Sequence, residues 1–261
     1  MVDKSKGHIQ GRQAQAVLSL GLKNWRKAVQ AAHHTNLAEL KRQRNRARRL
    51  KLQLDELLHV ADERLALPLA GNQTFPRPHD SDWHWRPELW CGSLPVAGIS
   101  AAATNSKFGK EVTLFHDCKH AEITMRQLRN MRGADLAAYG LRLDVLQFSG
   151  SYLSLAIDLP KEVTKGLKRN HVIRIDTIFE TEKPIDIFAR LNLQSGPNTE
   201  QSVRELPKDR QDRRVEFDLA YTDLNEKRIE KMWLDLIFEN PQMNQVVLRD
   251  LTLMRRKRAD I

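Results

Sequence analysis

Apolar and polar residues alternate along short segments of the chain after residue 111. The alternation is clearest in LRLDV, IDIFARLNL and VEFDL, where a period of two places apolar side chains on one face of a strand and polar side chains on the other. Six further runs are interpreted as strands, namely VTLFH, EITMR, YLSLAID, HVIRIDTIFE, MWLDLIFE and NQVVLRDLTLM. Short strands separated by turn residues predict an antiparallel sandwich or barrel for residues 111–261.

Residues 1–67 follow the three- and four-residue steps of amphipathic helices instead. The apolar residues at these steps are Val17, Leu18, Trp25, Val29, Ala32, Leu37, Leu40, Ala47, Leu54, Leu58, Ala61 and Leu65. Thr35 or Asn36 can cap a second helix, so we expect a break between two helices there. Because Arg44 and Lys51 fall on the apolar seam of the second helix, we expect its centre to be solvated and its ends to pack.

Residues 68–110 combine prolines with large aromatic side chains. Phe75, Trp83, Trp85 and Trp90 stand among five prolines in this segment. Burying such side chains stabilises a protein by roughly a few kcal/mol each, so a solvated linker rarely contains so many. We therefore expect an irregular strap that lies against the β domain and connects it to the helical segment.

Positive charge is concentrated near the N-terminal end. The net charge is +10, and the first 60 residues hold 13 Lys or Arg against four Asp or Glu. The densest cluster, KRQRNRARRLK, offers Lys41, Arg42, Arg44, Arg48, Arg49 and Lys51 for polyanion binding. Such a helix could neutralise the phosphates of nucleic acid or meet an anionic membrane surface. The alternative is a solvated helix face, because aromatic residues are not interleaved and no recognised DNA-binding motif is present.

The cysteines and the hydropathy profile restrict the class of protein further. Cys91 and Cys118 fit neither a zinc site nor a disulfide framework, which is typical of reduced thiols. No apolar run reaches the roughly 18 residues needed to cross a bilayer, and MVDKSKGHIQGR lacks the apolar stretch of a signal peptide. A cytoplasmic location is therefore expected.

Two clusters contain residue types that can bind metals or act as nucleophiles. HDSDWHW, at residues 79–85, meets no recognised ligand spacing. FHDCKH would place His116 and Cys118 on one face of a strand and Asp117 on the other, so a nucleophile, a base and an orienting group do not converge. We interpret both clusters as structural and expect no catalytic residue, no metal and no cofactor.

The strand alternation also predicts polar side chains that face away from the core. The candidate ligand-binding residues, including one neighbouring aromatic residue, are Asp176, Arg190, Asp218, Trp233, Asp235 and Arg249. Carboxylates and guanidinium groups on a sheet can bind sugar hydroxyls, and a tryptophan can stack on a sugar ring. The alternative is a ladder of cross-strand salt bridges. The paired carboxylates of a glycosidase are defined by a distance, which the sequence does not provide.

Two resemblances add to this interpretation. The ending WLDLIFENPQMNQVVLRDLTLMRRKRAD, with GPNTEQ and TLFHDC before it, resembles a family of uncharacterised alphaproteobacterial proteins that has no established function. The segments MWLDLIFE and VVLRDLTLMRR resemble the last two strands of galactose-binding-like jelly rolls, as in carbohydrate-binding modules. The second resemblance implies that the predicted sandwich is a jelly roll and makes a glycan a plausible ligand.

The sequence thus predicts a mainly β protein with an N-terminal α segment. Residues 1–67 form one or two helices, residues 68–110 a strap, and residues 111–261 a jelly-roll-like sandwich. The leading hypothesis is a non-catalytic protein whose sandwich recognises a glycan or a protein surface and whose helices mediate association with a second copy or a protein partner. One alternative is polyanion binding by the basic helix, and another is a carbohydrate-active enzyme.

Overall fold

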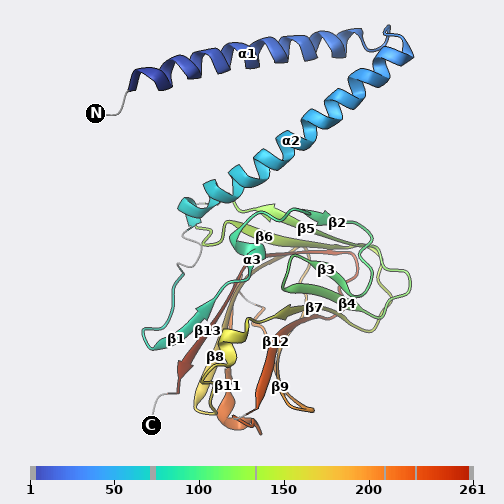
Figure 1. Cartoon of the computed structure of the whole chain (residues 1–261). Helices are drawn as coiled ribbons and strands as arrows, with labels where there is room; N and C mark the ends of the chain where they lie inside the picture. The colour runs from blue at the N-terminus through green and yellow to red at the C-terminus, as the bar shows by residue number, and fades with distance from the viewer. Residues whose placement is uncertain (1–3, 71–74, 133, 209, 227, 259–261) are drawn as a thin grey trace. The chain divides into compact units, whose positions relative to one another are not determined.

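A computed structural model of the chain describes residues 4–70, 75–132, 134–208, 210–226 and 228–258 (Figure 1). The chain divides into two compact units, Met1–Leu58 and His59–Ile261. Helix α1 (Lys4–Ala31) and the first two thirds of α2 (Leu37–Ala70) belong to the first unit. No described helix is both long enough and apolar enough to cross a lipid bilayer.

The expected break between the two helices is confirmed. Asn36 caps α2, because its side-chain Oδ1 accepts a hydrogen bond of 2.9 Å from the backbone N–H of Glu39. The Thr35 hydroxyl instead donates back to the carbonyl of Ala31 at the end of α1. The side chains of Val17, Leu58, Ala61 and Leu65, which the apolar pattern included, lie outside the described part of the chain.

The second unit is built from short antiparallel strands. Their bounds are β1 (Ser81–Trp85), β2 (Gly98–Ile99), β3 (Ser106–Phe108), β4 (Val112–His116), β5 (Ile123–Arg129), β6 (Tyr139–Val145), β7 (Leu153–Asp158), β8 (His171–Thr181), β9 (Ile187–Ser195), β10 (Asn198–Glu205), β11 (Asp212–Asp218), β12 (Ile229–Phe238) and β13 (Asn244–Lys257). Three single turns of helix, α3 (Glu88–Cys91), η1 (Lys161–Thr164) and η2 (Leu219–Tyr221), stand between them. All nine strands expected from the alternation are confirmed.

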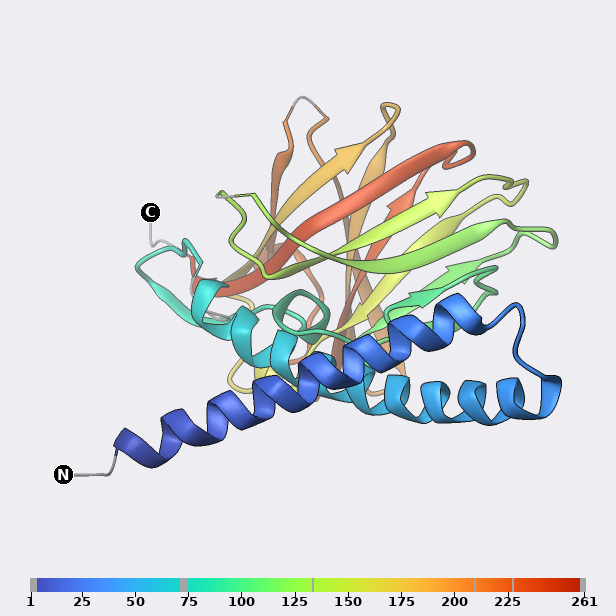
Figure 2. The ribbon, with the colours of Figure 1, turned by 90° about the horizontal axis from the view of Figure 1, so that it is seen from above.

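These strands form two sheets. Sheet A has the order β11-β8-β13-β6-β5-β2, with β1 also paired to β13, and sheet B has the order β10-β9-β12-β7-β4-β3. In Figure 2 the red strand β13 lies between the yellow-orange β8 and the yellow-green β6. From β6 onward, the quartets β6-β13-β8-β11 and β7-β12-β9-β10 have the strand pairing of a jelly roll. The predicted fold class is therefore confirmed.

The core lies between the two sheets and follows the period-two pattern. Ile173 and Ile175 of β8 and Leu234 and Leu236 of β12 are fully buried. They belong to one apolar cluster to which both sheets contribute. Since successive residues of a strand face opposite sides, the polar residues between them lie on the outer faces of the sandwich. Those outer faces are where a ligand can bind.

The Pro- and Trp-rich segment contributes to the same unit. Strand β1 pairs antiparallel with the end of β13. The fully buried Trp90 donates a hydrogen bond of 3.0 Å from its indole Nε1 to the carbonyl of Leu248. The side chain of Gln127, on β5, accepts a hydrogen bond of 2.8 Å from the backbone N–H of Leu94. Strands of both sheets thus precede residue 111, and the strap supplies part of the core.

Candidate functional site

The structure divides the six candidate ligand-binding residues between the two sheets. Asp176 on β8, Arg249 on β13 and Asp218 at the end of β11 belong to sheet A. The other three, Arg190 on β9 and Trp233 and Asp235 on β12, belong to sheet B. Because the outer faces of a sandwich point in opposite directions, the six residues cannot contact one small ligand together. Each face is a separate candidate surface.

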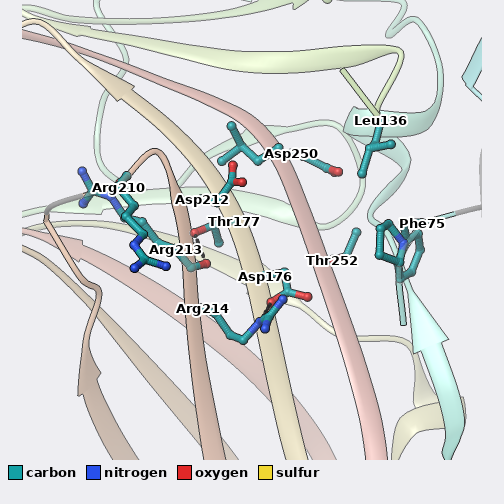
Figure 3. A pocket seen from close by; sticks show the side chains of 12 residues that line it. Phe75, Leu136, Asp176, Thr177, Arg210, Asp212, Arg213, Arg214, Asp250 and Thr252 are labelled. Atoms are coloured by element: carbon teal, nitrogen blue, oxygen red, sulfur yellow. Dashed lines mark hydrogen bonds and ion pairs between the residues drawn. The ribbon is translucent and has the colours of Figure 1, made fainter. Parts of the chain in front are cut away.

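A cleft of about 330 Å³ crosses the outer face of sheet A (Figure 3). Strands β11, β8 and β13 supply most of its lining, and two loops supply its apolar wall. The lining residues are Phe75, Pro76, Leu136, Asp176, Thr177, Ile178, Arg210, Asp212, Arg213, Arg214, Asp250 and Thr252. In Figure 3, Phe75 and Leu136 stand on one side of the cleft, and Arg210 and Arg213 stand on the other. The cleft therefore combines a charged side with an apolar side.

Asp176 lies in the floor of this cleft, between two neighbouring strands. The strand register places it opposite Arg214 of β11 and Thr252 of β13. Its carboxylate accepts hydrogen bonds of 2.7 Å from Arg214 Nε and 2.7 Å from Arg174 Nη2. These two arginines fix the carboxylate, and its side chain remains 25% exposed to the cleft. Asp176 is thus a pre-oriented acceptor rather than a mobile surface group.

A buried ion pair holds the side of the cleft that contains Phe75 in place. Arg86 donates to both oxygens of Asp250, from Nε at 2.9 Å and from Nη2 at 2.8 Å. Burial raises the pKa of Asp250, and the hydrogen bonds from Arg86 act in the opposite direction. The Arg86 guanidinium also lies 4.9 Å from the ring centroid of Phe75. The cleft wall is therefore anchored to β13 through a pair that water barely reaches.

Arg249 takes part in a different group, farther along sheet A. Its Nε and Nη2 donate to the two oxygens of Glu180 at 2.8 and 3.0 Å, and Arg132 pairs with the same carboxylate. Partial burial raises the pKa of Glu180, but the hydrogen bonds from Arg249 and Arg132 outweigh it and hold that pKa below its usual value. Asn130 accepts a further hydrogen bond from Arg249. These ion pairs correspond to the ladder of salt bridges that was considered as the alternative to a ligand-binding surface.

On sheet B, the candidate carboxylate of Asp235 is already hydrogen-bonded by neighbouring side chains. Arg190 donates from Nε and Nη2 to Oδ2 of Asp235, at 3.0 and 2.8 Å, and Asn192 donates to the same oxygen at 2.9 Å. Asp235 is only 5% exposed. The half-buried Trp233 lies next to this group, with Lys231 Nζ 5.5 Å from its ring centroid. This carboxylate therefore holds neighbouring strands together.

The two clusters that could have bound a metal or acted as a nucleophile have structural partners. Asp82 accepts hydrogen bonds of 2.9 and 3.0 Å from Arg255, and both ring nitrogens of His84 lie 2.8 Å from Arg77. Strand β4 ends at His116, so Cys118 follows the strand and does not share its face as the sequence suggested. Within the described ranges, no three His, Cys, Asp or Glu residues are arranged to hold a metal ion.

In the helical unit, the six candidate polyanion-binding residues are all exposed. They are Lys41, Arg42, Arg44, Arg48, Arg49 and Lys51, all on α2. Arg42 forms an ion pair of 2.7 Å with Glu39, one turn earlier on the same helix. The three residues Arg44, Arg48 and Lys51 are spaced by four and three positions and therefore share one helix face. All three side chains are exposed on this face.

Comparison with known structures finds similarity to carbohydrate-binding modules. One is the family 11 module from Clostridium thermocellum in complex with a β-1,3-1,4-mixed-linked tetrasaccharide, at 12% identity and a TM-score of 0.39, covering 64% of this chain and all of that one. Another is the CBM22-1 xylan-binding domain of Xyn10C from Paenibacillus barcinonensis, at 9% identity and a TM-score of 0.36, covering 70% of this chain and all of that one. At such low scores, the jelly-roll assignment rests on strand pairing alone.

No curated protein matches the chain significantly. Residues 4–261 match a family of unknown function, DUF6478. The predicted membership of an uncharacterised family is thus confirmed, whereas the alphaproteobacterial origin stays a prediction. The match extends over the helices, the strap and the jelly roll together. The chain belongs to this family of unknown function.

Proposed function

We propose that the jelly roll binds a glycan in the cleft on the outer face of sheet A. The observation that carries the proposal is the combination of fixed polar groups and an apolar wall in one cleft. Asp176 and Arg214 offer an acceptor and donors held by their mutual ion pair, and Phe75 supplies an apolar surface. Sugars present hydroxyls at their edges and C–H groups on their faces, so they need both kinds of contact.

The cleft is suited to binding more than to catalysis. Its volume of about 330 Å³ lies at the lower end of the range for small-molecule sites, roughly 300–1,000 Å³. A glycosidase needs one carboxyl group that can donate a proton and a second that attacks or activates water. Arg86 occupies both oxygens of Asp250, and arginines contact both oxygens of Asp176. Two of the three carboxylates of the cleft are thus held in ion pairs, and the third, of the exposed Asp212, is not part of these pairs. This arrangement favours recognition over hydrolysis.

A glycan array followed by calorimetry tests this function. The substitution Asp176→Ala should weaken binding by about tenfold or more, because a charge-assisted hydrogen bond to the ligand contributes roughly 1.5–3 kcal/mol. Trp233→Ala, on the other sheet, should leave the affinity unchanged. Arg126→Ala, an exposed change on β5, is the matched control on sheet A. Loss of binding in Trp233→Ala with normal binding in Asp176→Ala would move the site to sheet B.

The charge of α2 favours a second candidate function, binding of a polyanion. If the exposed Lys and Arg residues contact phosphates, affinity for duplex DNA should fall with salt, with a log–log slope of about 0.9 per contact. Reversing Arg44, Arg48 and Lys51 to glutamate should flatten that slope. The same reversal at Lys161, Lys165 and Lys168, which are exposed in the β unit, is a control of equal charge. Equal slopes in both triple variants would rule out α2 as the contact.

A further inference from the structure

A second cleft, of about 280 Å³, opens near the β11 edge of sheet A, and Arg204 of β10, in sheet B, also lines it. It is lined by Val172, Arg204, Glu216, Asp218, Tyr221, Arg256 and Arg258. Four of these residues lie on β8, β11 and β13, where the strand register places Asp218 opposite Val172 and Val172 opposite Arg256. Asp218, one of the residues expected from the sequence to bind a ligand, therefore belongs to this cleft and not to the first.

The second cleft contains more guanidinium groups than carboxylates. Arg256 pairs with Glu216 at 3.1 Å, and Arg258 lies 3.5 Å from Asp218. The third guanidinium, of Arg204, donates to the backbone carbonyl of Val203 at 2.9 Å. In the part of the chain that the structure describes, no carboxylate lies within ion-pair distance of Arg204. Three guanidinium groups against two carboxylates leave the cleft with an excess of positive charge.

An exposed aromatic ring borders the cleft. The Tyr221 side chain is 79% exposed, and Arg258 lies 5.7 Å from its ring centroid. The 3-10 turn η2 presents this ring, and Asp218 caps the turn by accepting a hydrogen bond of 3.0 Å from Ala220 N. The carboxylate that lies beside Arg258 thus also fixes the turn that carries Tyr221. A large exposed ring that neighbouring residues hold in position is suited to stacking on a ligand.

The two clefts lie in line along β8. Asp176 in the first cleft and Val172 in the second are four residues apart on the same face of that strand, which corresponds to roughly 13 Å. Arg174 lies between them, opposite Glu216 of β11. An elongated ligand that follows β8 can therefore contact both clefts at once. A chain of sugar residues has this shape.

We propose that the second cleft binds the anionic group of an acidic saccharide, so that the glycan recognised by sheet A carries charged sugars. This inference rests on the proposed glycan-binding function and names its ligand class. Arginine donates paired N–H groups that match the geometry of carboxylate and of other oxyanions. Arg204 supplies the uncompensated positive charge, and Tyr221 supplies the surface on which the sugar ring stacks.

An array of acidic oligosaccharides and their neutral counterparts tests this inference on the full chain. One arm carries oligouronides and their carboxyl-reduced forms, and the other carries sulfated oligosaccharides and their desulfated forms. The native protein should bind at least one acidic form about tenfold more tightly than its neutral counterpart, a difference of about 1.4 kcal/mol. Arg204→Gln should abolish this preference, because it removes the charge at an exposed position. The arm that responds identifies the anionic group.

Two controls separate the possible failures. Arg126→Gln removes an exposed arginine of sheet A that lines neither cleft, and it should keep the preference for acidic forms. Equal binding of acidic and neutral forms, sensitive to Asp176→Ala but not to Arg204→Gln, would overturn the acidic-ligand inference and leave the glycan-binding function intact. Absence of binding to every glycan of the array would overturn both. Thermal unfolding of each variant verifies that it is folded.

Discussion

At the scale of single residues, buried arginines connect the Pro- and Trp-rich strap to the last strand of sheet A. Arg86, 1% exposed, holds Asp250. On β13 itself, Arg255 donates to both oxygens of Asp82 and also to the carbonyl of Val163, in the η1 turn between β7 and β8. A buried ion pair adds little net stability relative to apolar residues of the same volume, but removing one partner is costly. These pairs therefore fix the position of the strap.

The Arg86 and Asp250 pair gives a direct prediction about stability. Asp250→Ala should lower the free energy of unfolding by about 3–5 kcal/mol, because it leaves the Arg86 guanidinium buried without its counter-charge. Asp144→Ala is a matched control, since Asp144 pairs with Arg142 on the same sheet, where the side chains stay 22% and 31% exposed and the loss should be smaller because solvent screens the charges. Urea unfolding measures both values. Equal losses in the two variants would contradict the account of the buried pair.

Sequence patterns predicted which side chains face outward but not which of them meet. Asp176 and Asp235 both occupy the outward positions that the alternation assigned to them. Alternation identifies the face of a strand and says nothing about its neighbour, so the partners Arg214 and Arg190, on other strands, could not be predicted. Two residues of the second cleft were missed for the same reason. They are Glu216, which pairs with Arg256, and Tyr221, whose ring borders the cleft. For the second cleft, the alternation did predict Asp218, and a tyrosine shortly after that strand was a further signal.

At the scale of elements, apolar periodicity predicted the buried strands and missed the polar one. Strand β10, with the sequence NTEQSVRE, has only one apolar residue, and that residue is exposed. It forms because its backbone pairs with β9 along its whole length, from Asn198 to Glu205. Strand β1 was interpreted as an irregular connector because of its surrounding prolines. Pairing with a long neighbour decided both cases, and a single-strand pattern does not contain that information.

The cap of α2 gives a prediction for this helix. Asn36→Ala should destabilise the first turn of α2 by about 1 kcal/mol, because the N–H of Glu39 loses its acceptor. Amide hydrogen exchange at the first residues of α2 should then accelerate by roughly fivefold, while exchange in the β unit stays unchanged. Asn36→Asp keeps an acceptor and should behave like the native chain. Unchanged exchange in Asn36→Ala would contradict the cap.

At the scale of the whole molecule, strand order brings residues from distant parts of the sequence onto one face. The jelly-roll pairing places β8 between β11 and β13, and these three strands supply most of the lining of both clefts. Alternation predicted a sandwich or barrel, and the resemblance of the last two strands implied a jelly roll. The clefts depend on the register between strands and on the strap, which no local pattern specifies. Association through the helices and a cytoplasmic location stay predictions.

Mapping of the binding surface by NMR tests the central claim most directly. The isotope-labelled protein is titrated with the oligosaccharide that binds most tightly in the array. We expect backbone signals to shift at Asp176, Arg214 and Thr252, which face the first cleft, while the indole signal of Trp233 on sheet B stays in place. Shifts confined to the outer face of sheet B, or the absence of any glycan that perturbs the spectrum, would contradict glycan binding by sheet A.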